Sequence, residues 1–335
     1  MKIDKFVFAI VISIAVAYFF PQMGASGSPI PLDTIASIGI SLIFFFYGLK
    51  LSTEAIKSGL KNWKLHVVVQ ASTFILFPLI VVLFYPLVKD TNQETLWLSL
   101  LFLASLPSTV SSSVVMVSLA KGNIPAAIFN ASISGIIGII VTPLWMTTFI
   151  QQTDIVYDFS AIYLQLGSEI LLPLILGLLL RKYLGTFAQK NKRGLNLFDK
   201  SVILIIIYKS FVHSFEEKVF SSVSFGDLLL MLALVVSLFF LVFFITGWIG
   251  KRLHFNREDR ITAQFCGTKK SLVHGTVFSE ALFGQSSIMG LMLLPLMLFH
   301  AIQILIISVL ATRMGEVETE REIAETRNHH GNKSH

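Results

Sequence analysis

The chain has little charge for its length. Asp, Glu, Lys and Arg make up 14% of its 335 residues, whereas typical soluble proteins contain about 25%. Hydrophobic residues reach 54% and the mean hydropathy is +0.75. These values exclude a soluble globular protein and favour one all-α, polytopic membrane domain. The only cysteine, Cys266, excludes a disulfide within the chain.

The sequence also lacks the motifs of enzyme chemistry. Neither H-E-x-x-H nor G-x-S-x-G occurs, and GTKKS at 267–271 does not have the spacing of a phosphate-binding loop. No set of His, Cys, Asp or Glu has metal-ligand spacing. The nearest nucleophile and base, Ser271 and Lys270, are sequence neighbours that do not face each other on a helix. We therefore expect no enzyme, no cofactor and no resident metal.

Ten apolar runs are long enough to cross a bilayer, which takes about 17–25 residues. They cover residues 5–20, 33–50, 64–88, 95–120, 123–150, 160–181, 200–215, 226–250, 258–283 and 287–312. Basic residues gather after the even-numbered runs, as at Lys57 and Arg193, and acidic ones after the odd-numbered runs, as at Asp90. The positive-inside rule then places both termini in the cytoplasm.

This distribution assigns the net charge of +6 to membrane orientation and not to a nucleic-acid partner. We expect an integral protein of a bacterial inner (plasma) membrane, with the lipid bilayer as its partner and an oligomeric state that the sequence leaves open. An alternative for the first run is a cleaved signal peptide, because Lys2 and Lys5 precede an apolar core and GASGS follows it.

Ten spans divide into two halves, 1–150 and 151–312, followed by a charged cytoplasmic tail at 313–335. Because five is odd, a duplicated half enters the membrane upside down, as in transporters built from inverted repeats. The fourth span of each half is interrupted by polar residues. Pro107 interrupts the first, among the hydroxyl side chains of Ser105, Ser108, Thr109, Ser111, Ser112 and Ser113. The second contains CGTKKSLVHG, with Thr268, Lys269, Lys270, Ser271 and His274.

Irregular backbone at membrane depth must face protein or a water-filled cavity. Paired interruptions at corresponding positions of two halves indicate a binding site near the bilayer midplane. Close helix packing through small and hydroxyl residues is the alternative explanation for the serines.

The segments SLPSTVSSSVVMVSLAKGN and CGTKKSLVHG resemble the bile acid:sodium symporter superfamily, in its bacterial and eukaryotic branch with a Lys-Lys version of the second motif. The resemblance covers about residues 5–312 and includes Gln70. It implies ten helices in two inverted five-helix repeats, a panel domain facing a core domain, and broken helices 4 and 9 that cross at the substrate and ion sites. It also implies transport of an organic anion coupled to sodium.

The sequence departs from the family at the sodium ligands. Val114 stands where the family has an asparagine, Ala127 and Ala131 replace hydroxyl residues, the key carboxylate aligns near Phe265 or Cys266, and Lys269 stands for a glutamine. Gln70 and Ser113 remain as oxygen ligands, which are too few for a hard cation unless backbone carbonyls at the interruptions add to them. Sodium coupling, proton coupling and uncoupled transport all stay open.

We hypothesise that the Lys269 ammonium occupies the place of the coupling sodium, donating to backbone carbonyls and to Ser111 or Ser113, while Lys270 pairs an anionic substrate. The alternative is that one lysine locks the crossing permanently and the other reaches toward water. His274 shares a helix face with Lys270 in this interpretation. Asn130 is a further candidate for lining the site.

Other polar residues within the spans receive weaker interpretations. Glu280 is expected to be interfacial or paired, and Glu169 and Lys209 line the site or pair with each other. His300 and Gln303 are expected to be packing contacts.

The sequence therefore predicts a secondary transporter of a small organic anion that works by alternating access. The alternative is a non-transporting membrane regulator of cellular calcium handling with a transporter fold.

Overall fold

The computed structural model describes residues 5–24, 28–50, 62–150, 164, 167–216, 218, 221, 223–284 and 286–331, and these contain helices but no β-strand. The longer helices are α1 (Lys5–Phe19), α2 (Leu32–Lys50), α4 (Trp63–Ala71), α7 (Glu94–Ser105), α8 (Val110–Leu119), α9 (Ile124–Ile150), α11 (Leu172–Lys190), α12 (Lys192–Glu216), α13 (Phe225–Arg252), α14 (Arg257–Thr268), α15 (Leu272–Phe283), α16 (Met289–Ile302) and α17 (Ser308–Gly331). Shorter turns are η1 (Pro21–Met23), η3 (Ser72–Leu76), α5 (Phe77–Val82), α6 (Tyr85–Val88), η4 (Gly167–Leu171) and η6 (Gln303–Ile307).

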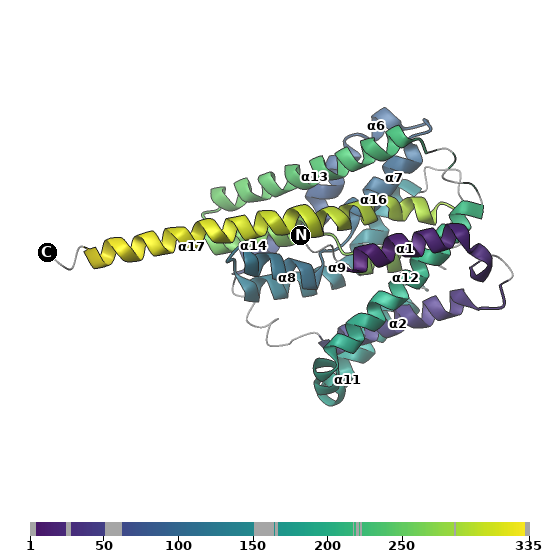
Figure 1. Ribbon diagram of the computed structural model, residues 1–335, viewed down its shortest axis with the longest axis horizontal. Coiled ribbons are helices and arrows are strands. Elements are labelled where there is room, and N and C mark those ends of the chain that lie inside the picture. The colour runs from purple at the N-terminus through teal and green to yellow at the C-terminus, as the bar shows by residue number, and fades with distance from the viewer. Residues whose placement is uncertain are drawn as a thin grey trace.

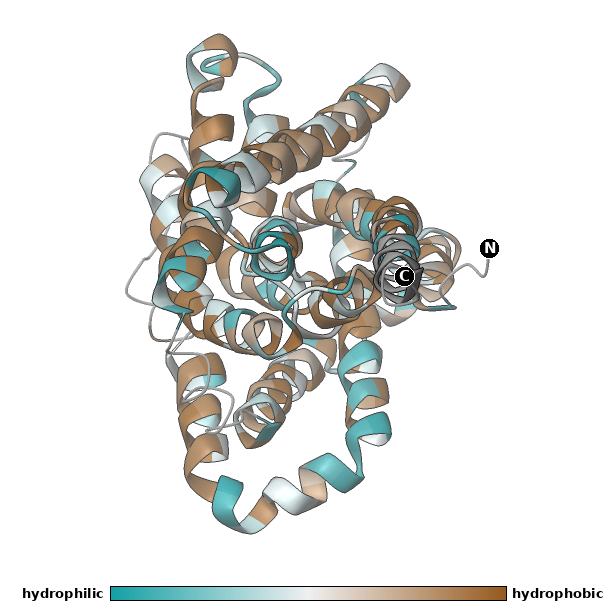
Figure 2. Cartoon of the chain, turned by 90° about the vertical axis from the view of Figure 1, so that its left-hand side faces the viewer, coloured by the Kyte–Doolittle hydropathy of each residue, from teal (hydrophilic) through white to brown (hydrophobic). Residues whose placement is uncertain are grey.

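The helices are apolar enough for a membrane. Among the described residues, five runs are both long and hydrophobic enough to cross a bilayer: α2, residues 63–82, α9, residues 167–190 and α13. Shorter apolar helices lie at Phe8–Phe19, Glu94–Ser105 and Met289–Ile302. Hydrophobic residues dominate these helices, and hydrophilic ones concentrate in a few segments (Figure 2). The expectation of a polytopic, all-α integral membrane protein is confirmed at this level.

The helices pack in two groups. In one, α2 packs against α11 and α12, and α1 packs against α12; Figure 1 shows α2 and α11 on the side of the molecule opposite α13. We call these four helices the first group and α4–α9 with α13–α16 the second group. Helix α12 also contacts α15 and α16, so it forms part of the seam between the groups.

Two glycines bring α2 and α11 into backbone contact. A Cβ on Gly48 would lie 2.3 Å from the carbonyl oxygen of Leu174, and one on Gly177 would lie 2.1 Å from that of Phe45. Small residues at helix crossings allow this approach in membranes. The first group is therefore held together by a contact that larger side chains would prevent.

Two helices extend beyond the apolar runs. The sixth run ends at residue 181 and the seventh begins at 200, whereas α11 continues to Lys190 and α12 begins at Lys192. Both extensions carry charged residues, which helices tolerate once they leave hydrocarbon. Similarly, α17 runs without a break from Ser308 to Gly331 and projects beyond the bundle (Figure 1), while tail residues 332–335 lie outside the described residues.

Candidate functional site

Two helix interruptions meet inside the second group. Helix α7 ends at Ser105 and α8 begins at Val110, while α14 ends at Thr268 and α15 begins at Leu272. The amide of Ser271 donates to the carbonyl of Pro107 at 2.9 Å, which joins the two segments. We call residues 106–109 and 269–271, with their contacts, the crossing. Pro107 explains the first interruption, because it has no N–H and disfavours a helical residue before it.

Lys270 fills the centre of the crossing. Its side chain is fully buried, and its ammonium donates to three backbone carbonyls, those of Thr73 at 2.8 Å, Ala104 at 2.5 Å and Leu106 at 2.9 Å. The ammonium also lies 4.3 Å from the centre of the Phe77 ring. An ammonium has three N–H donors, so each has an acceptor and the ring adds a cation–π contact.

The carbonyl of Thr73 is available because the third span contains a π-helical turn. In η3 the backbone N–H of Phe77 donates to the backbone carbonyl of Ser72. The next residue, Pro78, has no N–H. Thr73 and Phe74 therefore lack their usual helical partners. Lys270 takes the first carbonyl, and the indole of Trp145 donates to the second at 2.8 Å.

The carbonyls around Pro107 are all paired. The Lys270 ammonium donates to the backbone carbonyls of Ala104 and Leu106. The hydroxyl of Thr142 donates to the carbonyl of Ser105 at 2.8 Å. The backbone N–H of Ser271 donates to the carbonyl of Pro107. Buried backbone groups need such partners, since leaving one unpaired is costly. One lysine, one hydroxyl and one backbone amide thus replace the hydrogen bonds that the interruption removes.

Gln303, which was expected to be a packing contact, supports the second interruption. Its amide oxygen accepts from the backbone N–H of Lys270 at 3.1 Å, and its amide nitrogen donates to the Lys270 carbonyl at 3.1 Å. On the other side, the Ser271 hydroxyl accepts from the His274 amide at 3.3 Å and caps α15. A glutamine in an apolar span was the sequence signal for this role.

The contacts predicted for one lysine of the pair are made by the other. The carbonyls predicted to accept from Lys269 accept from Lys270 instead. Lys269 is also fully buried, so it does not reach toward water, and its ammonium has no hydrogen-bond partner among the described residues. The backbone at Lys269 is extended, and successive side chains of an extended segment point to opposite sides. The locking role of the alternative hypothesis fits Lys270.

The serine cluster packs mainly against itself and α9. The Ser108 amide donates to the Ser134 hydroxyl at 2.9 Å, and the hydroxyls of Ser108 and Ser113 lie 3.2 Å apart. Thr109 and Ser112 are half-buried, and the side chain of Ser111 lies outside the described residues. Thr268 donates to the carbonyl of Gln264 at 2.6 Å. Among the described contacts, Lys270 and not Lys269 approaches the first interruption.

Gln70 and Asn130 form a pair beside the crossing. The Gln70 amide nitrogen donates to the Asn130 backbone carbonyl at 3.1 Å and to its side-chain oxygen at 3.3 Å. Asn130 donates in turn to Ala126 at 2.9 Å. The side-chain oxygen of Gln70 is buried and, within the described part of the chain, has no hydrogen-bond partner. The role of this oxygen as an ion ligand stays a prediction.

His274 lies at the seam between the two groups. Its Nδ1 is 2.8 Å from the Ser271 hydroxyl, and the rings of Phe44 and Tyr47 from α2 meet it edge-on at 5.5 and 5.6 Å. Its Nε2 is buried without a hydrogen-bond partner among the described residues. The predicted shared helix face with Lys270 is wrong, because Lys270 precedes the first turn of α15.

A second charged cluster lies on the same seam. Lys209 of α12 forms ion pairs with Glu280 of α15, at 2.5 Å, and with Asp33 of α2. Glu280 is paired, as expected. Glu169, which was expected to line the site or to pair with Lys209, accepts a hydrogen bond from the hydroxyl of Ser37 at 2.7 Å.

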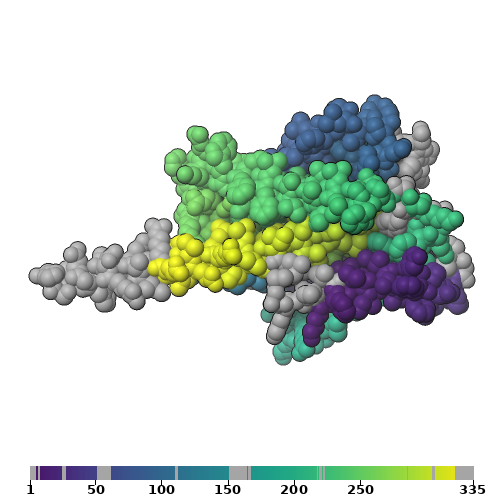
Figure 3. Space-filling model, turned by 45° about the horizontal axis from the view of Figure 1, so that its top comes forward, coloured from purple at the N-terminus to yellow at the C-terminus, as the bar shows by residue number. Residues whose placement is uncertain are grey.

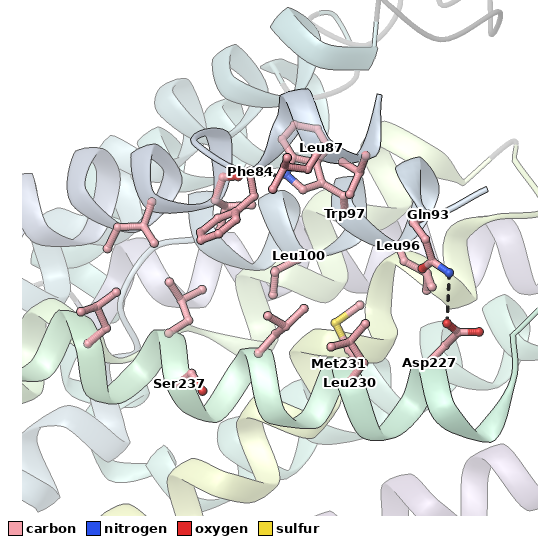
Figure 4. A pocket seen from close by; sticks show the side chains of 16 residues that line it. Phe84, Leu87, Gln93, Leu96, Trp97, Leu100, Asp227, Leu230, Met231 and Ser237 are labelled. Carbon is pink, nitrogen blue, oxygen red and sulfur yellow. Dashed lines mark hydrogen bonds between the residues drawn. The ribbon is translucent and has the colours of Figure 1, made fainter. Parts of the chain in front are cut away.

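A separate cavity of about 560 Å³ lies between residues 80–100 and α13. Figure 3 shows the two segments side by side, and in Figure 4 the lining side chains are almost entirely apolar, with a Gln93–Asp227 hydrogen bond of 3.1 Å at one end. The candidate site residues are absent from its lining. Among the described residues that line it, Asp227 is the only charged one, so they offer no cation for an anionic substrate.

Known proteins resemble this chain over nearly its whole length. Residues 4–316 match the SBF-like CPA transporter family. An uncharacterized protein of Pseudomonas aeruginosa is 36% identical over 92% of this chain and 92% of its own length. Sodium/bile acid cotransporter 7 of Rattus norvegicus is 33% identical over 92% of this chain and 91% of its own, and that of Danio rerio is 33% identical over 92% of each.

These matches confirm the resemblance to the bile acid:sodium symporter superfamily. They also agree with the missing catalytic motifs, since the family consists of transporters and not enzymes. The chain belongs to the SBF-like CPA transporter family.

Proposed function

We propose that the protein is a secondary transporter of a small organic anion that works by alternating access between two inverted five-helix repeats. The names of the cotransporter relatives support bile acids as one anion to test. The charge distribution supports cytoplasmic termini in a bacterial inner membrane. In this proposal the first and second helix groups are the panel and the core, and the interrupted helices carry the site.

The observation that carries the proposal is the difference between the two adjacent lysines. Lys270 has an acceptor for each N–H, whereas the Lys269 ammonium is buried with no described hydrogen-bond partner. A buried cation without a counter-ion is strongly unfavourable. A carboxylate or sulfate bound at Lys269 removes that penalty. Lys269 is thus the proposed anion-binding residue.

The same geometry bears on sodium. The carbonyl oxygens that would suit a hard cation already accept from the Lys270 ammonium, and Ser113 is engaged with Ser108. Among the oxygens predicted as sodium ligands, that of Gln70 has no described partner, and one oxygen does not make a cation site. We propose that Lys270 acts as a tethered cation and that transport does not use sodium.

The test is thermal unfolding of the full chain in detergent, with sodium or choline salts and with a panel of carboxylates and sulfates that includes a bile acid. We expect one class of anion to stabilise the native chain and not Lys269→Gln. Lys64→Gln is the matched control, because Lys64 is exposed and its loss leaves the anion effect intact. We expect sodium and choline to give equal stability.

Two results would contradict the proposal. Stabilisation of the native chain by sodium over choline means that a sodium site exists. No stabilisation by any anion, together with no uptake into proteoliposomes, favours the non-transporting regulator. Full burial of Lys269, Ser108 and Ser113 is the observation that keeps this second function in view, because it leaves the site closed in this conformation.

A further inference from the structure

The cluster around Lys209 joins the two helix groups at one level of the membrane. Lys209 belongs to α12 and Asp33 to α2, both in the first group, while Glu280 belongs to α15 in the second group. Glu280 follows Lys270 by ten residues, so it lies about 15 Å further along the span at 1.5 Å per residue. With cytoplasmic termini, this is the extracytoplasmic side of the crossing.

The three side chains differ in their exposure to water. The side chains of Lys209 and Glu280 are only 13% and 11% exposed, while that of Asp33 is 85% exposed. One oxygen of Glu280 accepts from Lys209, and the other is buried without a hydrogen-bond partner in the described part of the chain. Among the described residues, Lys209 is the cation that acts on Glu280, and the negative charges of Asp33 and Glu169 act on it as well.

Separation of the two helix groups affects the ion pairing of Lys209 and Glu280 differently. Lys209 moves with Asp33 and keeps a counter-ion within its own group. Glu280 loses the cation that holds it and retains an unpaired oxygen in an apolar helix. A carboxylate in that state is strongly disfavoured, and binding a proton removes its charge.

We propose that Glu280 is a proton-binding site separate from the crossing, and that protonation of its carboxylate releases Lys209 and opens the seam on the extracytoplasmic side. The proton enters from that side, forms an O–H bond on the carboxylate and breaks only the ion pair. The inference rests on the proposed transport function, because it names the proton as the coupling ion. It assigns the proton to the seam and the anion to Lys269.

The test measures the distance between the two groups directly. Spin labels on Glu216→Cys, in α12, and Phe225→Cys, at the start of α13, report the separation by pulsed electron resonance in lipid nanodiscs. Both positions are exposed, whereas the native Cys266 is fully buried and is expected not to react; a chain without introduced cysteines checks this. We expect the native pair to shift toward longer distances between pH 8 and pH 5. The ratio of open to closed molecules rises by up to about tenfold per pH unit, because one proton is bound.

Variants identify the group that binds the proton. Glu280→Gln imitates the protonated side chain, so its distances are long at both pH values. If Glu280→Gln does not fold, Lys209→Met serves in its place. This variant keeps the carboxyl group but removes the cation, so its distances are also expected to be long at both pH values. Asp33→Asn keeps the pH response, because its carboxyl group is exposed.

An unchanged distance in the native chain across this pH range would overturn the inference. A pH response that survives in Glu280→Gln would also overturn it. The measurement needs no substrate, so its outcome is separate from that of the Lys269 experiment. If Glu280→Gln loses the pH-dependent change in distance, the proton site is supported even if no anion binds at Lys269.

Discussion

Two lysines inside the helix bundle, the buried Lys270 and the half-buried Lys209, are held in different ways. Lys270 donates to three neutral carbonyls of Thr73, Ala104 and Leu106, which come from two other spans. Lys209 instead pairs with the carboxylates of Glu280 and Asp33 on the seam between the helix groups. A backbone carbonyl does not bind a proton near neutral pH, whereas a carboxylate in an apolar site can. The first arrangement is therefore a permanent brace, and the second is suited to opening.

Removing the brace is expected to give the largest effect. Lys270→Met keeps the length of the side chain but leaves three buried carbonyls unpaired. Each unpaired group costs about 1–3 kcal/mol, so we expect the free energy of unfolding to fall by about 4 kcal/mol or more. Unfolding in mixed micelles as the SDS fraction rises measures it.

Lys269→Met is the matched control for this variant. It removes an ammonium with no described hydrogen-bond partner, so its free energy of unfolding is expected to equal or exceed that of the native chain. Equal destabilisation by the two substitutions would mean that both lysines stabilise the fold equally, which would contradict the assignment of the bracing role to Lys270 alone.

The charge-paired lysine is expected to give the second largest effect, and one that depends on pH. Lys209→Met leaves Glu280 buried without its cation, which costs about 3 kcal/mol. The loss is larger at pH 8 than at pH 5, because protonation at low pH removes the unpaired charge. The double variant Lys209→Met/Glu280→Gln removes both charges and recovers most of the stability. Thermal unfolding of the three chains at both pH values checks this, and a loss independent of pH would contradict it.

The sequence predicted where the crossing lies but not how it is held. Pro107 and the Lys-Lys pair mark the two interruptions because a proline or a charge in an apolar span is visible locally. Which of Lys269 and Lys270 contacts the first interruption depends on the side of the extended segment that each side chain faces. Helical periodicity does not predict this direction, because the segment is not helical. The partners of Lys270 also lie far away in sequence, 33 residues off for Gln303 and 197 for Thr73.

A third prediction tests the support of the brace. Gln303→Leu removes both hydrogen bonds to the Lys270 backbone and leaves a buried N–H and C=O unpaired. We expect a loss of about 2 kcal/mol in the free energy of unfolding, measured in the same SDS titration. Gln93→Leu is the control, because its hydrogen bond to Asp227 is exposed, and it is expected to change stability by less than about 0.5 kcal/mol. Similar losses in the two variants would show that Gln303 does not hold the crossing.

The smallest expected effect concerns the π-helical turn that frees the Thr73 carbonyl for Lys270. Trp145→Phe keeps an aromatic ring but leaves the neighbouring carbonyl of Phe74 without its donor, at a cost of about 1 kcal/mol. Trp63→Phe, at a side chain that is 63% exposed, is expected to have no measurable effect. A loss in Trp145→Phe that disappears when Lys270 is already methionine would mean that the turn is stabilised as one unit by both donors. Equal losses in the two backgrounds would instead mean that the ammonium and the indole hold the turn independently, so that the brace reaches no further than the carbonyls it contacts.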